Sequence, residues 1–135
     1  MNANIISRLG QATVTGEIPF PEIVGRLIAE GVEYYHVDYA CLQMQLYGIE
    51  GGVVRVPLLL DALQPIAPQL DKVALRAAIV DSQQNGQKFK DFSRRAVQAG
   101  VAGYFAFLGG KRVTYLGRQG DQHIEWFPGA ERTDT

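Results

Sequence analysis

The chain of 135 residues has few features that tie a protein to a membrane, an oxidising compartment or a nucleic acid. Its single cysteine, Cys41, cannot form an internal disulfide, the usual sign of an extracellular protein. No apolar run approaches the roughly 20 residues that span a bilayer, and residues 1–10 lack the basic start and apolar run of a signal peptide. The formal net charge is −1, so no long-range positive field gathers phosphates. We therefore expect a cytoplasmic protein without a membrane partner, and we do not expect nucleic acid as its main partner.

Short motifs that carry chemistry are also absent from the sequence. It has no GxGxxG dinucleotide fingerprint, no Walker A loop, no HExxH zinc motif and no GxSxG nucleophile motif. The glycines at 48, 51 and 52 indicate turns rather than a phosphate-binding loop, because no helix follows with its N-terminus directed at them. We therefore predict no catalytic residue, no metal and no cofactor, and we expect a protein that is not an enzyme.

The composition is that of an ordinary globular protein. Apolar residues make up 47% of the chain and charged residues 20%, which argues against a disordered or fibrous class. A chain of this length removes about two thirds of its unfolded surface from water, enough to form a core without disulfides. We expect one domain over residues 1–135.

The sequence contains an internal repeat with a constant offset. Phe89 follows Phe20 by 69 positions. The same offset joins further pairs, namely Arg26 and Arg95, Gly31 and Gly100, Val32 and Val101, and Tyr35 and Tyr104. A long period that occurs only twice indicates one duplicated unit rather than a solenoid. We place the two units at residues 20–57 and 89–128.

Each unit begins with a helix and continues into β-strands. Apolar residues recur at helical spacing over residues 20–31, and Gly31 is able to end that helix with a positive φ. The pattern returns over residues 89–100, where Gly100 takes the same place. Alternating segments separated by glycine-containing turns follow both helices. They predict strands at residues 33–40, 43–48, 53–56, 103–108, 111–116 and 122–127.

Two more helices are predicted outside the repeat. One covers residues 4–12, and the other is a linking helix near 71–84 with Asp71 as its N-cap. A three-stranded unit with one helix buries too little surface by itself, so we expect both units to share one core. The predicted fold class is α+β, with a duplicated helix–strand–strand unit, an antiparallel sheet of about six strands and the helices mainly on one face.

Two stretches of the sequence carry a resemblance to a known family. The first is GEIPFPEIVGRLIAEGVEYYHVDYACLQMQLYG, residues 16–48, and the second is NGQKFKDFSRRAVQAGVAGYFAFLGGKRVTYLGRQGDQHIEWFP, residues 85–128. Both resemble the YbcV-like family, a bacterial family of unknown function, and the likeness extends over roughly residues 5–128. Members are often labelled phage envelope proteins, so the resemblance implies a link to prophages. It implies no activity, cofactor or catalytic residue.

Two histidines lie beside carboxylates on the predicted strands. His36 and Asp38 are two residues apart, so their side chains share one face of a strand, and His123 and Glu125 have the same spacing. An imidazole with a carboxylate can bind zinc or orient a general base, but a metal site needs three or four converging ligands. We therefore expect solvated strand histidines. The alternative hypothesis is a small-molecule-binding or modest enzymatic site in a cleft between the units, formed by Tyr34, His36, Asp38 and His123.

Tyrosines and basic residues form two further groups for which we expect structural roles. Six tyrosines more often pack a sheet against helices than bind a ligand; they are Tyr34, Tyr35, Tyr39, Tyr47, Tyr104 and Tyr115. The second predicted repeat helix carries a basic stretch that we expect to be a solvated face rather than a nucleic-acid contact, made of Lys88, Lys90, Arg94 and Arg95.

Comparison of the two units draws attention to a pair of phenylalanines. By the offset of 69, Phe105 and Phe107 occupy the strand face that carries His36 and Asp38 in the first unit. If that face is exposed in both units, the two rings lie side by side and mark a contact surface. Alternatively, one of the helices outside the repeat covers this part of the sheet. The first possibility supports an interaction or accessory domain that self-associates as a homodimer and has an unknown protein partner.

Overall fold

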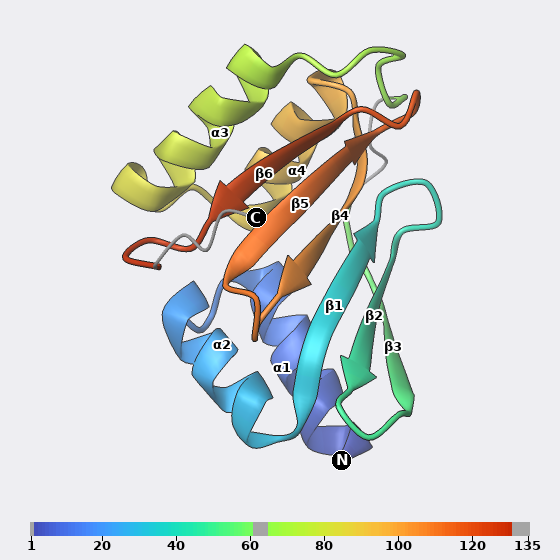
Figure 1. Ribbon diagram of the computed structural model, residues 1–135, viewed down its shortest axis with the longest axis vertical. Helices are drawn as coiled ribbons and strands as arrows, with labels where there is room; N and C mark the ends of the chain where they lie inside the picture. The colour runs from blue at the N-terminus through green and yellow to red at the C-terminus, as the bar shows by residue number, and fades with distance from the viewer. Residues whose placement is uncertain (1, 61–64, 131–135) are drawn as a thin grey trace.

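Two units of five elements follow one another along the chain in the computed structural model, which describes residues 2–60 and 65–130 (Figure 1). The first unit contains α1 (Ala3–Thr15), α2 (Phe20–Ala29), β1 (Val32–Asp38), β2 (Gln43–Gly48) and β3 (Val53–Pro57). The second unit contains α3 (Lys72–Asn85), α4 (Phe89–Gln98), β4 (Val101–Phe107), β5 (Arg112–Gly117) and β6 (Gln122–Trp126). Each element of the second unit begins 69 residues after its counterpart, as Lys72 follows Ala3. The prediction that α1 and α3 lie outside the repeat is therefore wrong, because each is the first helix of its unit.

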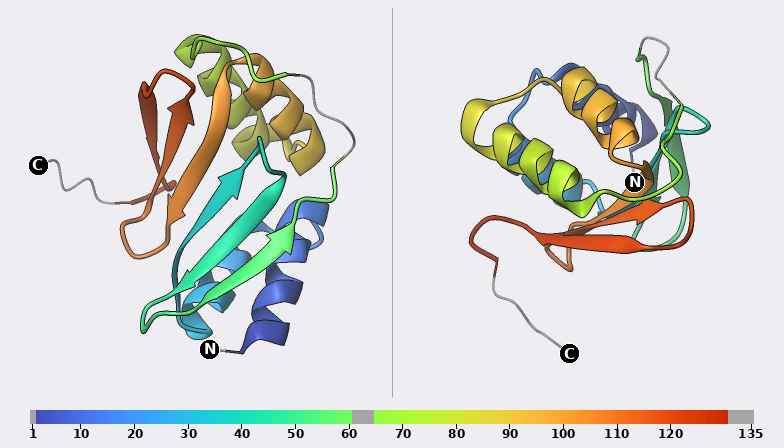
Figure 2. Two further views of the ribbon diagram at one scale, coloured as in Figure 1. Left: turned by 90° about the vertical axis from the view of Figure 1, so that its right-hand side faces the viewer. Right: turned by 90° about the horizontal axis from the view of Figure 1, so that it is seen from above.

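The six strands of the described chain form one antiparallel sheet in the order β3-β2-β1-β4-β5-β6. The first strands of the two units, β1 and β4, are neighbours at its centre, and the third strands lie at its two edges. This result confirms the predicted α+β class with a six-stranded antiparallel sheet. Figure 2 shows the helices on one side of the sheet, and no helix of the described residues lies on the other side.

The register between β1 and β4 defines an approximate two-fold axis. His36 is paired with Phe105, and the two positions are equivalent in the repeat because 69 residues separate them. Neighbouring pairs of the same register exchange with one another under that offset. The axis therefore passes between His36 and Phe105, and it relates the two halves of one continuous sheet.

The helix ends follow the chemistry expected from the sequence. Asp71 is the N-cap of α3, and its side chain accepts a hydrogen bond from the N–H of Ala74. Asn2 caps α1 in the same way. Gly31 and Gly100 follow α2 and α4 with φ angles of 85° and 92°, in the left-handed region that favours glycine. Both glycine predictions are confirmed.

Alternate strand residues and one stripe of each helix form a buried core that extends across both units. The expectation that tyrosines pack this core holds for four of them: Tyr35, Tyr39, Tyr104 and Tyr115. Burial raises the pKa of all four hydroxyl groups, because the phenolate would lose its hydration. The hydroxyl groups of Tyr39 and Ser93 lie 3.0 Å apart and form a hydrogen bond. Tyr34 and Tyr47 lie elsewhere, on the side of the sheet without helices.

The two equivalent glycines make a matched pair for a stability test. Gly31→Ala should reduce the free energy of unfolding by about 1 kcal/mol, because a Cβ disfavours positive φ and no other atom lies within 4 Å of it. At Gly100 a Cβ would overlap the carbonyl oxygen of Gln69 and lie 2.6 Å from its carbonyl carbon. Gly100→Ala should therefore cost roughly 3 kcal/mol or more, since strain and overlap add. Urea unfolding monitored by circular dichroism measures the decrease in the free energy of unfolding for both variants. Equal decreases would show that Gln69 does not pack on the second unit as described.

Candidate functional site

The side of the sheet opposite the helices carries a group of aromatic side chains, and we call it the open face. Its residues occupy two rows across the strands, and none of them is fully buried. The rows follow from the strand register and consist of Val53, Tyr47, Tyr34, Phe107, Arg112 and Trp126, and of Arg55, Gln45, His36, Phe105, Thr114 and Ile124. The structure thus brings Tyr34, His36, Phe105 and Phe107 together on one surface. The repeat offset predicted that Phe105 and Phe107 occupy the strand face equivalent to that of His36, and the pairing of β1 with β4 makes these two faces continuous.

The aromatic rings of the open face stack on one another. The ring centroids of Tyr34 and Tyr47 are 4.6 Å apart at an interplanar angle of 16°. His36 lies 4.3 Å from Phe105 at 12°, and Phe105 lies 5.8 Å from Phe107 at 11°. Nearly parallel rings at such distances overlap face to face or with an offset. Their edges therefore point outward, while much of their flat surface is already in contact.

His36 is held in place by three neighbours. Its Nδ1 lies 3.3 Å from Oε1 of Gln45, and its ring stacks on Phe105. On another side is Gly103, where a Cβ would lie 3.2 Å from Nε2 of His36 and 2.6 Å from the carbonyl oxygen of Val37. Gly103 corresponds to Tyr34 in the repeat, so the second unit leaves room for the imidazole where the first unit has a tyrosine.

Asp38 has a structural role in the turn between β1 and β2. Its Oδ1 accepts hydrogen bonds from the backbone N–H groups of Ala40 and Cys41, at 2.9 and 3.1 Å. This arrangement is an Asx-turn, in which the carboxylate takes the place of a backbone acceptor. Oδ1 of this predicted ligand-binding residue is therefore already engaged by the protein's own backbone.

His123 lies on the opposite side of the sheet from His36. It pairs with the buried Tyr115, and its Nε2 is 3.0 Å from Oε1 of Glu125, which in turn accepts hydrogen bonds of 2.6 Å from Arg76 on α3. Tyr34, His36, Asp38 and His123 consequently do not form one site. The repeat itself contained the signal, because the offset of 69 aligns His123 with Val54, an inward position of β3.

A groove occupies one end of the open face. It has a volume of about 440 Å³ and is lined by residues of both units, with Glu33 and Tyr34 from the first and Phe107, Arg112 and Ile124 among those from the second. The guanidinium carbon of Arg112 lies 4.5 Å from the ring centroid of Trp126 in a cation–π contact. Sequence reasoning missed Glu33, Arg112 and Trp126, because their proximity depends on the order of the strands across the two units.

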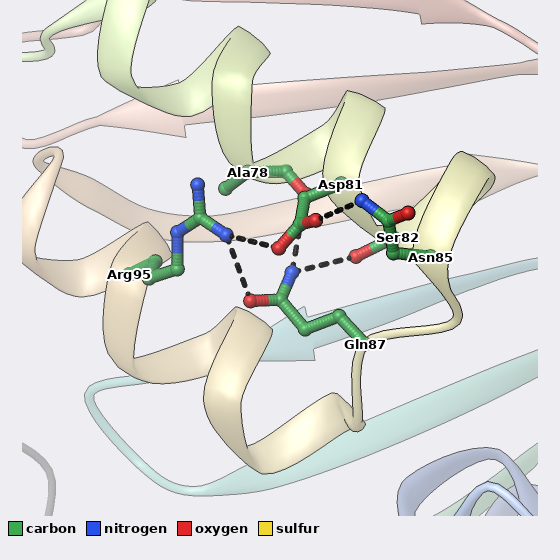
Figure 3. A network of polar contacts seen from close by, with 6 residues as sticks. All are labelled: Ala78, Asp81, Ser82, Asn85, Gln87 and Arg95. Carbon is green, nitrogen blue, oxygen red and sulfur yellow. Dashed lines mark hydrogen bonds and ion pairs between the residues drawn. The ribbon is translucent and has the colours of Figure 1, made fainter.

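The basic stretch on α4 is partly used in a polar network that joins α3 to α4 (Figure 3). Arg95 donates to Oδ2 of Asp81 at 2.7 Å and to Oε1 of Gln87 at 2.9 Å. Asn85 donates to the other oxygen of Asp81 at 2.6 Å, and Gln87 donates to Oγ of Ser82 at 2.9 Å. Hydrogen bonds from Asn85 and then from Arg95 lower the pKa of Asp81. The network connects the two helices, which is a structural role for Arg95.

Comparison with known families adds one result. A family model described as "Protein of unknown function (DUF1398)" matches residues 10–125. The chain belongs to the DUF1398 family. The matched region includes all or part of every helix and strand of both units, so the open face of this DUF1398 member lies almost wholly within it. No curated protein sequence matches the chain. Over the part of the chain that the structure describes, no helix is both long and apolar enough to cross a bilayer.

The exposed thiol of Cys41 provides a test of the turn chemistry. The charge of Asp38 and a hydrogen bond to it raise the pKa of the thiol, which reduces the reactive thiolate near neutral pH. Asp38→Asn keeps an oxygen for the two turn N–H groups but removes the charge. We expect it to speed alkylation of Cys41 by iodoacetamide at pH 7.5, and a rate series over pH would locate the shift. Glu50→Gln, in the turn after β2, is the matched control, and an unchanged rate in Asp38→Asn would contradict this account.

Proposed function

We propose that the protein is a non-enzymatic interaction domain that self-associates by packing the open face of one copy against that of another. The observation that carries this proposal is the aromatic cluster centred on His36 and Phe105. It lies on the side of the sheet that carries no helix among the described residues (Figure 2). Half-buried aromatic residues gathered on one surface are typical of protein contact sites.

The size of the open face is compatible with a dimer interface. Six strands about 4.8 Å apart, with about five residues of roughly 3.3 Å each, give a flat area of about 500 Å². Because side chains protrude from the sheet, the accessible area of the open face exceeds this flat area. Standard interfaces bury about 800 Å² per partner. Transfer of apolar surface from water at about 25 cal/mol per Å² then supplies the driving force.

The way the rings stack favours a protein partner over a flat ligand. Nucleobases and sugars bind aromatic side chains through free ring faces. Here the ring of Tyr34 is stacked with Tyr47, and that of Phe105 with both His36 and Phe107. Ring edges interdigitate with the side chains of another protein surface, which makes a second sheet face the better fit.

A second candidate function is small-molecule binding in the groove, favoured by its volume of about 440 Å³ and its lining from both units. Such a ligand would contact Tyr34 and Arg112, which line the groove, and not Asp38 or His123, which lie outside it. Thermal unfolding with a metabolite panel tests it, and a midpoint that no compound raises would argue against it.

We also propose that the chain is a YbcV-like protein, that it acts in the cytoplasm and that residues 1–135 form a single domain. Residues 16–48 and 85–128 carry the resemblance, and the label of that family connects such a domain to prophages. One cysteine in the whole chain supports a reducing compartment. A core that extends across both units supports the single domain.

Phe105→Glu tests self-association directly. Wild-type protein should show a mass approaching twice the 14.9 kDa chain mass with rising concentration in light scattering. Phe105→Glu should remain a monomer, because a carboxylate at the centre of the interface would be buried without a partner. Ile49→Glu is the control, since Ile49 is 69% exposed in a turn outside the open face. Circular dichroism must show that both variants fold, and a wild-type monomer at all concentrations would sink the proposal.

A further inference from the structure

Two opposite charges lie at the groove of the open face, and neither has an ion-pair partner among the described residues. The carboxylate of Glu33 and the guanidinium of Arg112 line the same groove, and neither side chain forms an ion pair or hydrogen bond within the described residues. Glu33 is exposed, whereas Arg112 is half-buried. Asp38, the acidic residue at the far end of β1, is already engaged by its own turn.

The strand order explains why these two charges do not meet within one copy. Glu33 is on β1 and Arg112 is on β5, and β4 with Phe107 lies between them. Two strand spacings place their backbones about 10 Å apart, and no ion pair joins the two side chains within the described residues. Each charge therefore remains available to a group outside the copy that carries it.

Arg112 is also oriented in advance for such a partner. Its guanidinium lies over the indole of Trp126, with 4.5 Å between the guanidinium carbon and the ring centroid. A guanidinium stacked on an aromatic ring keeps the N–H donors in its own plane free, and these donors bind a carboxylate in a bidentate manner. The groove is an open depression rather than an enclosed cavity, which suits a side chain of another protein surface better than a free small molecule.

From these observations we infer that the partner at the open face is a second copy of the chain, held in register by two reciprocal ion pairs between Glu33 of one copy and Arg112 of the other. This inference rests on the proposed self-association. In a two-fold dimer, a contact between one residue of the first copy and a different residue of the second copy occurs twice, because the symmetry repeats it with the copies exchanged. One cation and one anion on the same surface thus give two pairs per dimer. A shifted register would place Arg112 over Arg112, so the pairs fix orientation as well as adding affinity.

Charge reversal tests the pairing with four proteins measured by sedimentation equilibrium. Arg112→Glu alone and Glu33→Arg alone should each weaken the dimer by at least about tenfold, since each places like charges together. The double variant Glu33→Arg/Arg112→Glu should regain most of the wild-type affinity. Arg8→Glu is the control for net charge, because Arg8 is exposed on α1 on the other side of the sheet.

A mixture of the two single variants gives a sharper result. Each heterodimer contains two complementary pairs, whereas each homodimer contains two repulsive ones, so mixing two monomeric proteins should produce a dimer. This outcome also shows that both single variants are folded. Dimerisation of the single variants with wild-type affinity, or failure of the mixture and the double variant to dimerise, overturns the pairing while leaving self-association in place. A monomeric wild-type protein overturns both, which separates the two failures.

Discussion

The antiparallel pairing of β1 with β4 is the contact on which both faces of the sheet depend. On the helix side it places Val37 beside Tyr104, and so it joins the buried residues of two units into one core. On the open face it places His36 against Phe105, which creates a stack that neither unit has by itself. A single unit would have only three strands, near the lower limit for independent stability. The central pair therefore accounts for the cooperation of the two halves and for the surface that we assign to association.

The two units use the same backbone with different chemistry on the helix side. Val56 in the first unit corresponds to Glu125 in the second, and α1 approaches β3 so closely that a Cβ on Gly10 would lie 3.0 Å from a methyl group of Val56. In the second unit Arg76 spans from α3 to Glu125, which also contacts His123. A carboxylate only 13% exposed is costly unless it is paired. In the second unit this carboxylate is paired with Arg76 and His123, whereas the equivalent position in the first unit is the apolar Val56.

Local chemistry made much of the fold predictable from the sequence. The end of α2 at Gly31 and the N-cap of α3 at Asp71 could be predicted because each helix end depends on only a few adjacent residues. The prediction for His123 failed because it considered spacing along one strand and not the repeat, which aligns this residue with the inward Val54. The stacking of Phe105 on its neighbour in β1 depends on the order of strands across the two units. Alternation along single strands does not contain that information, since it is set by contacts between residues far apart in the sequence.

The strand order also bears on whether copies of the chain could add to one another edge to edge. β3 and β6 are the third strands of their units, so the sheet ends in two edges with related backbone geometry. An edge contact between β3 of one copy and β6 of the next would be heterologous, and it would repeat into a filament. Pro57 lacks a backbone N–H and closes β3, and the exposed Arg55 adds a charge along that edge. In the proposed dimer, by contrast, packing through the flat side of the sheet is complete after two copies, so that contact would not repeat into a filament.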